Sequence, residues 1–194
     1  MEIEFFRLDH PEHESGLLKV GAKFSVGEYL NERGRDLYNQ ISTASKFEEE
    51  ISTRTIKYGY ELVIKTIKEI PRDELNNSRK FRACVELYYE IIRFHEFNDL
   101  PSRFKCFYAA TDKENMIKWA VHLMPQPPMQ ALFCKGIGKG FRADSALLNF
   151  RFDHPNEIET FPYKYWRGDI TKEGLQEWLF VGDIEVIRNV DDEE

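Results

Sequence analysis

Residues 78–97 read SRKFRACVELYYEIIRFHEF, and this stretch decides the fold more than any other. Its apolar residues recur at intervals of three and four, which places them on one face of a helix. They are Phe81, Cys84, Val85, Tyr88, Ile91 and Ile92, with His95 on the same face. Because the face is wide, we expect this helix to lie at the centre of the domain. The run Asn98-Asp99-Leu100-Pro101 then ends it.

A second helix is predicted upstream, over residues 54–70. Its apolar positions, among them Ile56, Val63 and Ile67, also follow the helical spacing. Ser52 or Thr53 is expected to cap its start, and Pro71 to end it.

Short β-prone runs surround these helices. Residues 3–8 predict a first strand, residues 103–109 a strand in mid-chain, and residues 131–135 a further strand. Between the last two, the capping-box pattern Thr111-Asp112-Lys113-Glu114 predicts the start of another helix.

The C-terminal region carries two more β-prone runs. Residues 178–181 and 184–187 flank Gly182-Asp183, which predicts two strands joined by a hairpin or a bend. Residues 153–162, just upstream, are expected to form a loop.

The order of these elements is one strand, then helices, then mostly strands with one helix among them. This order predicts an α+β fold rather than an alternating βαβ fold. A length of 194 residues favours a single domain, residues 1–190. The last four residues, 191–194, are all acidic and are expected to form a solvated tail.

Composition and charge exclude several classes of protein. The formal net charge is −7 and the sequence pI is about 5.4, which argues against a general nucleic-acid coat. No apolar run approaches the length of about 20 residues that a membrane helix needs, so no membrane partner is expected. The three cysteines, Cys84, Cys106 and Cys134, are widely spaced, which argues against a disulfide framework and favours a cytoplasmic protein.

Two isolated motifs carry little information about function. The run Gly136-Ile137-Gly138-Lys139-Gly140 lacks the spacing and the ending of a phosphate-binding loop, so we expect a flexible turn. The pair His10 and His13 lacks the HExxH spacing and a third ligand, so no metal site is predicted.

Three segments are more informative together. The first, Phe5-Phe6-Arg7-Leu8-Asp9, places an Arg late in the opening strand. The second is Leu100-Pro101-Ser102-Arg103-Phe104, and the third is Tyr165-Trp166-Arg167-Gly168-Asp169 followed by residues 176–184, QEWLFVGDI.

Taken in order, these segments resemble the Arg-Ser-Glu layout of the ADP-ribosyltransferase superfamily. They are also similar to a poorly characterised bacterial and phage family placed near it. The resemblance implies a split pair of small antiparallel sheets with flanking helices. It also implies transfer of ADP-ribose from NAD to a protein or nucleic-acid acceptor, in a toxin, phage-defence or phage-takeover setting.

Residue by residue, the resemblance assigns Glu177 as the catalytic carboxylate and Arg7, Ser102 and Arg103 to the binding of NAD. Tyr165 and Trp166 fall in the loop that faces the acceptor. A carboxylate suits this chemistry, because breaking the nicotinamide–ribose bond builds positive charge at the ribose carbon. An Arg fork in turn suits a pyrophosphate.

Two departures from the superfamily pattern keep other functions open. Pro-Ser-Arg stands where Ser-Thr-Ser is usual, and Leu175 stands two residues before Glu177. A second hypothesis is therefore a binding module on the same fold that has lost catalysis. A third is an acidic interaction or immunity protein, which the net charge and the acidic tail favour.

Overall fold

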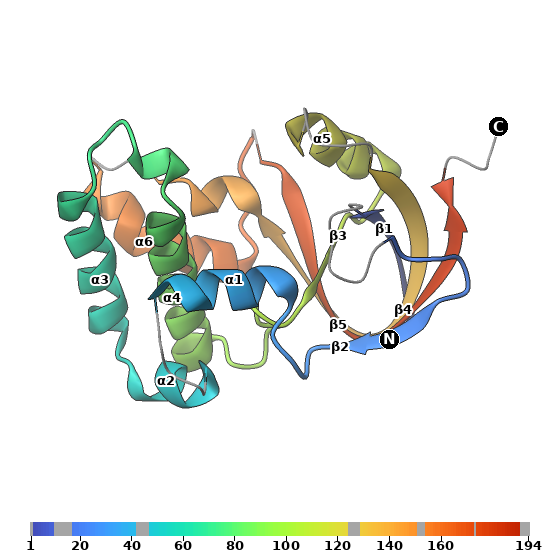
Figure 1. Ribbon diagram of the computed structural model, residues 1–194, viewed down its shortest axis with the longest axis horizontal. Coiled ribbons are helices and arrows are strands. Elements are labelled where there is room, and N and C mark those ends of the chain that lie inside the picture. Colours follow the sequence, from blue (N-terminus) through green and yellow to red (C-terminus); the bar gives the residue numbers. More distant parts are fainter. Residues whose placement is uncertain are drawn as a thin grey trace.

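The computed structural model describes residues 2–9, 17–41, 47–123, 129–150, 154–172 and 174–190. A group of helices forms one part of the molecule, and a strongly curved antiparallel sheet forms the other (Figure 1). The predicted α+β class is confirmed. The predicted tail, residues 191–194, lies outside the described residues. Within them, no helix has both the length and the apolar character needed to cross a membrane.

The sheet is built on two long neighbouring strands. Its strands are β1 (Glu2–Asp9), β2 (Lys23–Val26), β3 (Phe107–Ala109), β4 (Gln130–Asp144) and β5 (Gln176–Asn189). They lie in the order β1-β4-β5-β2, and β3 pairs with the first half of β5. A further bridge joins Phe6 of β1 to Ala110, directly after β3. The sheet therefore curls back on itself around a core that includes Phe5, Leu132 and Phe180, none of them exposed.

The glycine run of residues 136–140 lies inside β4, so the predicted flexible turn is wrong. A side chain at Gly136 would stand 2.5 Å from the Phe180 ring, and one at Gly140 would stand 2.2 Å from the Trp178 indole. Glycine is therefore needed here because two strands and their rings approach closely, and not because the chain turns.

The two predicted C-terminal strands are one continuous strand, β5. Gly182 has a φ of 135° within it, and a side chain there would stand 2.4 Å from the carbonyl oxygen of Ile137. The glycine lets the strand curve while it stays paired with β4 and β2, so no hairpin forms.

The helical part surrounds one buried helix. Its members are α1 (Glu32–Ile41), α2 (Phe47–Thr53), α3 (Ile56–Glu69), α4 (Arg79–Glu96) and α6 (Pro155–Arg167), with short 3-10 turns η1 (Leu75–Asn77) and η2 (Ser145–Leu148). The central position predicted for residues 78–97 is confirmed, since α4 is buried along most of its length. The helix predicted over 54–70 is α3, but Thr55 caps it, because Ser52 and Thr53 still belong to α2.

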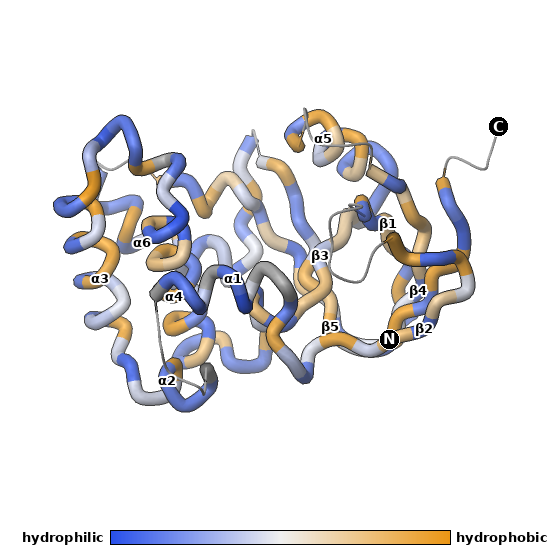
Figure 2. The backbone as a smooth tube through the Cα atoms, viewed as in Figure 1, coloured by the Kyte–Doolittle hydropathy of each residue, from blue (hydrophilic) through white to orange (hydrophobic). Residues whose placement is uncertain are grey.

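The remaining helix, α5 (Lys113–Leu123), packs on the outer side of the sheet, with Met116 and Trp119 toward it. Figure 2 shows hydrophobic positions on this helix, and Ile117 and Val121 are exposed. The loop predicted over 153–162 is wrong, because α6 begins at Pro155. Proline suits a first helical turn, since its missing N–H would have no helical partner there.

Candidate functional site

Three of the six predicted site residues meet in one buried cluster with a fourth residue. Arg103 follows α4, Tyr165 lies in the last turn of α6, and Glu177 lies near the start of β5. Glu86, in the middle of α4, completes what we call the Arg103 cluster. The exposed fractions of Arg103 and Tyr165 are 1% and 0%, and that of Glu177 is 4%. The cluster therefore joins the helical part to the sheet through polar side chains.

Arg103 is the hub of the cluster. Its Nε donates to Oε2 of Glu86 over 2.6 Å, and its second terminal nitrogen donates to Oε1 of Glu86 over 3.0 Å. The first terminal nitrogen donates to both the Tyr165 hydroxyl and Oε1 of Glu177. The Tyr165 hydroxyl donates in turn to Oε1 of Glu177, over 2.5 Å. The planar guanidinium fork suits such a set of carboxylate acceptors.

The electrostatics of the cluster raise the pKa values of Arg103 and Tyr165. Burial by itself would lower the pKa of Arg103, but the carboxylates of Glu177 and Glu86 raise it well above its ordinary value. Burial also raises the pKa of Tyr165, against the effect of Arg103, so its hydroxyl stays protonated and donates. Two carboxyl groups therefore contact a single guanidinium in this cluster.

Asn31 fixes the turn that carries Arg103. Its amide nitrogen donates to the carbonyl oxygens of Arg103 and Cys106, over 3.0 and 2.8 Å, and the Tyr108 hydroxyl donates to the Arg103 carbonyl over 2.7 Å. These contacts explain why the strand predicted over 103–109 forms only at 107–109, since the preceding residues are held in a turn.

Sequence reasoning missed Glu86 and Asn31. Glu86 had a usable signal, because Glu86 and Glu90 are the two charged residues in the otherwise uncharged run of residues 83–92, where a buried carboxylate needs a partner. Asn31 had only a local signal, since its Oδ1 accepts from Gly34 N–H as a helix N-cap does, whereas the carbonyl groups that its amide nitrogen contacts lie more than 70 residues away.

Tyr165 and Trp166 do not lie in an acceptor-facing loop. Both are buried residues of α6, so that expectation is wrong. Trp166 donates from Nε1 to the carbonyl oxygen of Tyr89 over 2.8 Å and stacks on Phe141 with a centroid separation of 5.8 Å. The helix ends at Gly168, whose φ of 79° provides the left-handed C-cap. Trp166 is therefore a packing residue between α6, α4 and β4.

Arg7 is outside the cluster. It donates to the carbonyl oxygen of Tyr108 over 2.8 Å, and its guanidinium carbon lies 4.6 Å from the centre of the Phe107 ring. Burial lowers its pKa, although Asp9 opposes this effect. Tyr108 thus contacts both arginines, one through its backbone and the other through its hydroxyl.

Ser102 lines a different feature, a surface hollow of about 550 Å³ beside α4 that we call the Glu90 hollow. The hydroxyl oxygen of Ser102 accepts from the backbone N–H of Phe104 over 3.2 Å. The wall also carries charged side chains from α2, from α4 and from the turn, namely Glu48, Glu49, Glu90, Arg93 and Lys105. Glu177 and Arg7 do not line it.

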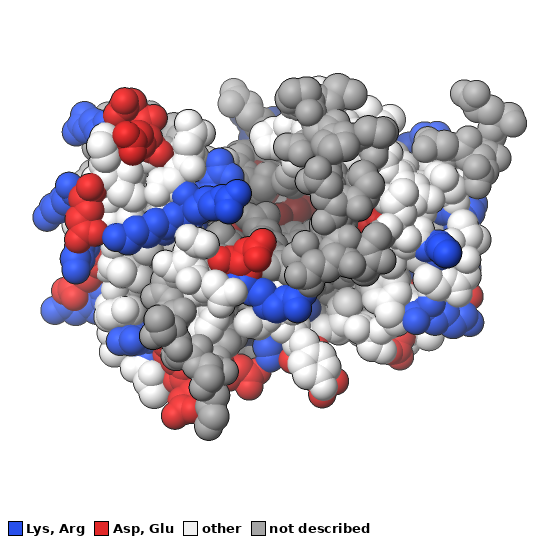
Figure 3. Space-filling view, viewed as in Figure 1, with Lys and Arg blue, Asp and Glu red and all other residues white. Residues whose placement is uncertain are grey.

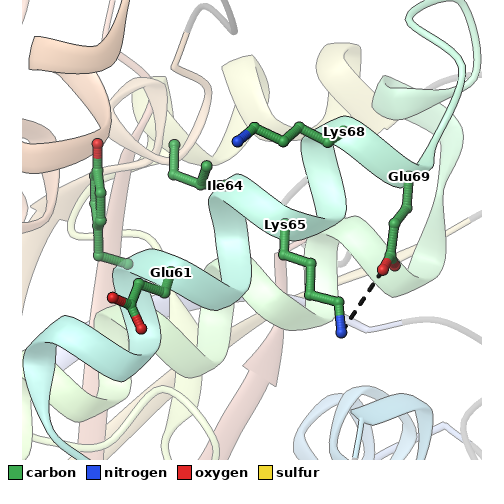
Figure 4. Close-up of a pocket in the computed structure, with 6 residues that line it drawn as sticks. Glu61, Ile64, Lys65, Lys68 and Glu69 are labelled. Atoms are coloured by element: carbon green, nitrogen blue, oxygen red, sulfur yellow. Dashed lines mark ion pairs between the residues drawn. The ribbon is translucent and has the colours of Figure 1, made fainter.

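A second hollow is a shallow depression on α3 (Figure 4). Its walls are Glu61, Lys65, Lys68 and Glu69, and Lys65 pairs with Glu69 over 3.7 Å. Figure 3 shows Lys and Arg interspersed with Asp and Glu over the helical part of one face. Among the described residues, no three His, Cys, Asp or Glu side chains are grouped to hold a metal ion.

Comparison with known proteins gives a family but no activity. Residues 10–192, nearly the whole chain, match a family described as "protein of unknown function (DUF2441)". No curated protein matches the chain.

Proposed function

The chain belongs to the DUF2441 family, and we propose that it is a mono-ADP-ribosyltransferase that cleaves NAD with the carboxylate of Glu177. The observation that carries this proposal is the Arg103 cluster. Three residues that the resemblance named share hydrogen bonds there, and Arg103 is more than 60 residues from Tyr165 and from Glu177 in the sequence. The acceptor is a protein or a nucleic acid.

Glu177 is held in a way that suits an electrostatic role. Arg103 and Tyr165 both donate to Oε1. Among the residues that the structure describes, none donates a hydrogen bond to Oε2 of Glu177. One oxygen is thus fixed by the protein, and the other is left for the ribose. A carboxylate held this way needs little reorganisation when positive charge develops on the substrate.

The presence of two carboxyl groups beside one guanidinium supports the same reaction. Loss of nicotinamide leaves an oxocarbenium-like ribose, and the acceptor then supplies the electron pair that forms the new bond. Buried negative charge favours that cationic state over neutral ground-state ribose. Tyr165 and Arg103 are positioning residues in this scheme, because they act through Glu177.

The geometry argues against one role that the resemblance assigned, the binding of NAD by Arg103. All three nitrogens of the Arg103 guanidinium donate to partners inside the cluster, so the expected contact with an NAD phosphate does not fit. Arg7 is the better candidate for a phosphate, although it already contacts Tyr108. Because Glu177 is 4% exposed, NAD reaches it only when neighbouring side chains move.

We also propose that the sheet is a variant of the superfamily's split pair. The first half of β5 pairs with β3 and with the end of β4, whereas its second half pairs with β2 and with the start of β4. Two small sheets joined through two long strands would give this pairing. The curvature at Gly182 lies between the two halves.

One observation favours a second candidate, a binding module without catalysis. Glu177 and Arg103 form a buried ion pair, and such pairs also serve as purely structural links. In that case, replacing Glu177 would change stability but would remove no activity.

The deciding experiment measures nicotinamide release from NAD by the purified protein, with and without cell lysate. Glu177→Gln keeps the size of the side chain and an acceptor for Tyr165, and should reduce release by about a hundredfold or more. Glu185→Gln is the matched control, because Glu185 lies on the same strand but its side chain is 43% exposed. Absence of release by the folded wild-type protein in both conditions would reject the enzyme and favour the binding module.

A further inference from the structure

Two buried carboxylates lie one helical turn apart on α4, and they differ in how they are satisfied. Glu86 binds Arg103 through both oxygens. Glu90 contacts Arg93 through Oε1, which accepts a hydrogen bond from Nε over 2.8 Å and lies 2.7 Å from a terminal nitrogen in an ion pair. Oε2 of Glu90 is buried and has no hydrogen-bond partner among the described residues. A buried carboxylate oxygen without a donor costs free energy that a bound donor would recover.

The unpartnered oxygen belongs to a side chain that lines the Glu90 hollow. The cations of the same wall are already engaged. Arg93 also donates to the carbonyl oxygen of Leu100 over 3.0 Å, and Lys105 pairs with Glu48. Oε2 of Glu90 can therefore still accept a hydrogen bond. A ligand that binds it needs a hydrogen-bond donor and a positive charge.

We propose that the Glu90 hollow binds a primary alkylammonium group, with the ammonium on Oε2 of Glu90. A guanidinium fits less well, because its fork needs two free carboxylate oxygens and Arg93 already occupies Oε1. An ammonium is a compact charge that needs only one such oxygen. The hollow, of about 550 Å³, is within the range of ligand sites.

The alkyl part of the ligand has apolar neighbours in the same wall. Ile51 is buried beneath the hollow, and Phe94 lines it with 36% of its surface exposed. Because Oε2 is covered, the ammonium reaches it by displacing a lining side chain. Burial of the alkyl chain against Ile51 and Phe94 offsets part of that cost.

The test is titration of the folded protein with n-butylamine, followed by calorimetry and by the shift in melting temperature. We expect saturable binding with a dissociation constant of about 1 mM, typical of so small a ligand. Methylguanidine should bind about tenfold more weakly, and butyrate should not bind. Binding of methylguanidine as tight as that of butylamine, or no saturable binding of butylamine, would overturn the proposal.

Glu90→Gln should weaken butylamine binding by about tenfold or more, since the acceptor loses its charge. Glu61→Gln makes the same change in the α3 depression of Figure 4 and should leave the affinity unchanged. Should Glu90→Gln fail to fold, Ser52→Trp keeps Glu90 and fills the mouth of the hollow. Unaltered binding in a folded Glu90→Gln variant, or in Ser52→Trp, would place the amine elsewhere and refute the site.

The alkylammonium has two sources, a free amine or the lysine side chain of a protein. A lysine-containing tripeptide with blocked ends distinguishes them, since tighter binding than butylamine indicates a protein lysine and weaker binding a free amine. The proposal does not depend on NAD cleavage. Glu177→Gln should bind butylamine as the wild-type protein does, whatever its effect on nicotinamide release.

Discussion

The Arg103 cluster and the Glu90 hollow contain similar residues but differ in how their buried glutamates are hydrogen-bonded. Each uses a buried glutamate of α4 and an arginine. In the cluster, the arginine comes from a turn beyond the helix, and α6 and β5 supply further partners. In the hollow, Arg93 lies three residues from Glu90 on the same helix, and it leaves one oxygen unpartnered within the described residues. Among the described residues, Glu86 has both oxygens bonded by a partner from a distant turn, whereas Glu90 has one oxygen bonded by a neighbour on its own helix.

The largest effect should come from removing the hub of the cluster. Arg103→Met leaves Glu86 and Glu177 buried without their cation, which should lower the free energy of unfolding by about 3–5 kcal/mol. Denaturant unfolding followed by circular dichroism measures the loss. A loss of unfolding free energy below about 1 kcal/mol would mean that hydration or protonation of the two glutamates replaces Arg103. The cluster would then depend on its arginine no more than the hollow does.

Tyr165→Phe should have a smaller effect on the same cluster. The change removes one hydroxyl, while Arg103 still binds Glu177, so we expect a loss of about 1–2 kcal/mol. The same unfolding experiment measures it. If Tyr165 positions Glu177 for catalysis, the variant should also lose more in kcat than in KM for NAD. A variant as stable and active as the wild-type protein would exclude both roles.

Glu90→Gln should change stability least, within about 1 kcal/mol. The variant loses the attraction to Arg93, but it no longer buries a half-satisfied charge, and Arg93 keeps its carbonyl acceptor at Leu100. Comparison with Glu86→Gln sharpens the contrast, since that carboxylate has both oxygens engaged by Arg103. Equal losses of unfolding free energy for the two substitutions would show that the missing partner at Oε2 of Glu90 does not affect stability.

The helices of the fold were predictable because their signals are local. The spacing of apolar residues and the terminating Pro71 located α3 and α4 to within a few residues. The first strand was also found, since residues 3–8 lie within β1. The class of the fold followed from the order of these elements alone.

The errors concern places where distant residues decide the conformation. The glycines of residues 136–140, for which the sequence predicted a turn, lie in a strand, because the Phe180 and Trp178 rings of β5 pack directly against them. The expected acceptor loop is the end of a helix, because Tyr165 and Trp166 bury their side chains between α4 and the sheet. Neither the packing of rings on these glycines nor the burial of the two aromatic residues can be recognised from a short stretch of sequence.

For the site, the sequence by itself determined which ionisable residues would need partners, since a glutamate in an apolar helix face or an arginine before a strand is costly to bury without one. Only the tertiary structure decided that Arg103 meets Glu86, Tyr165 and Glu177, and that Oε2 of Glu90 finds no donor within the described part of the chain. The reason is physical: helix formation depends on contacts three and four residues apart, whereas pairing of buried charges depends on which distant segments the curled sheet and α4 bring within hydrogen-bond distance.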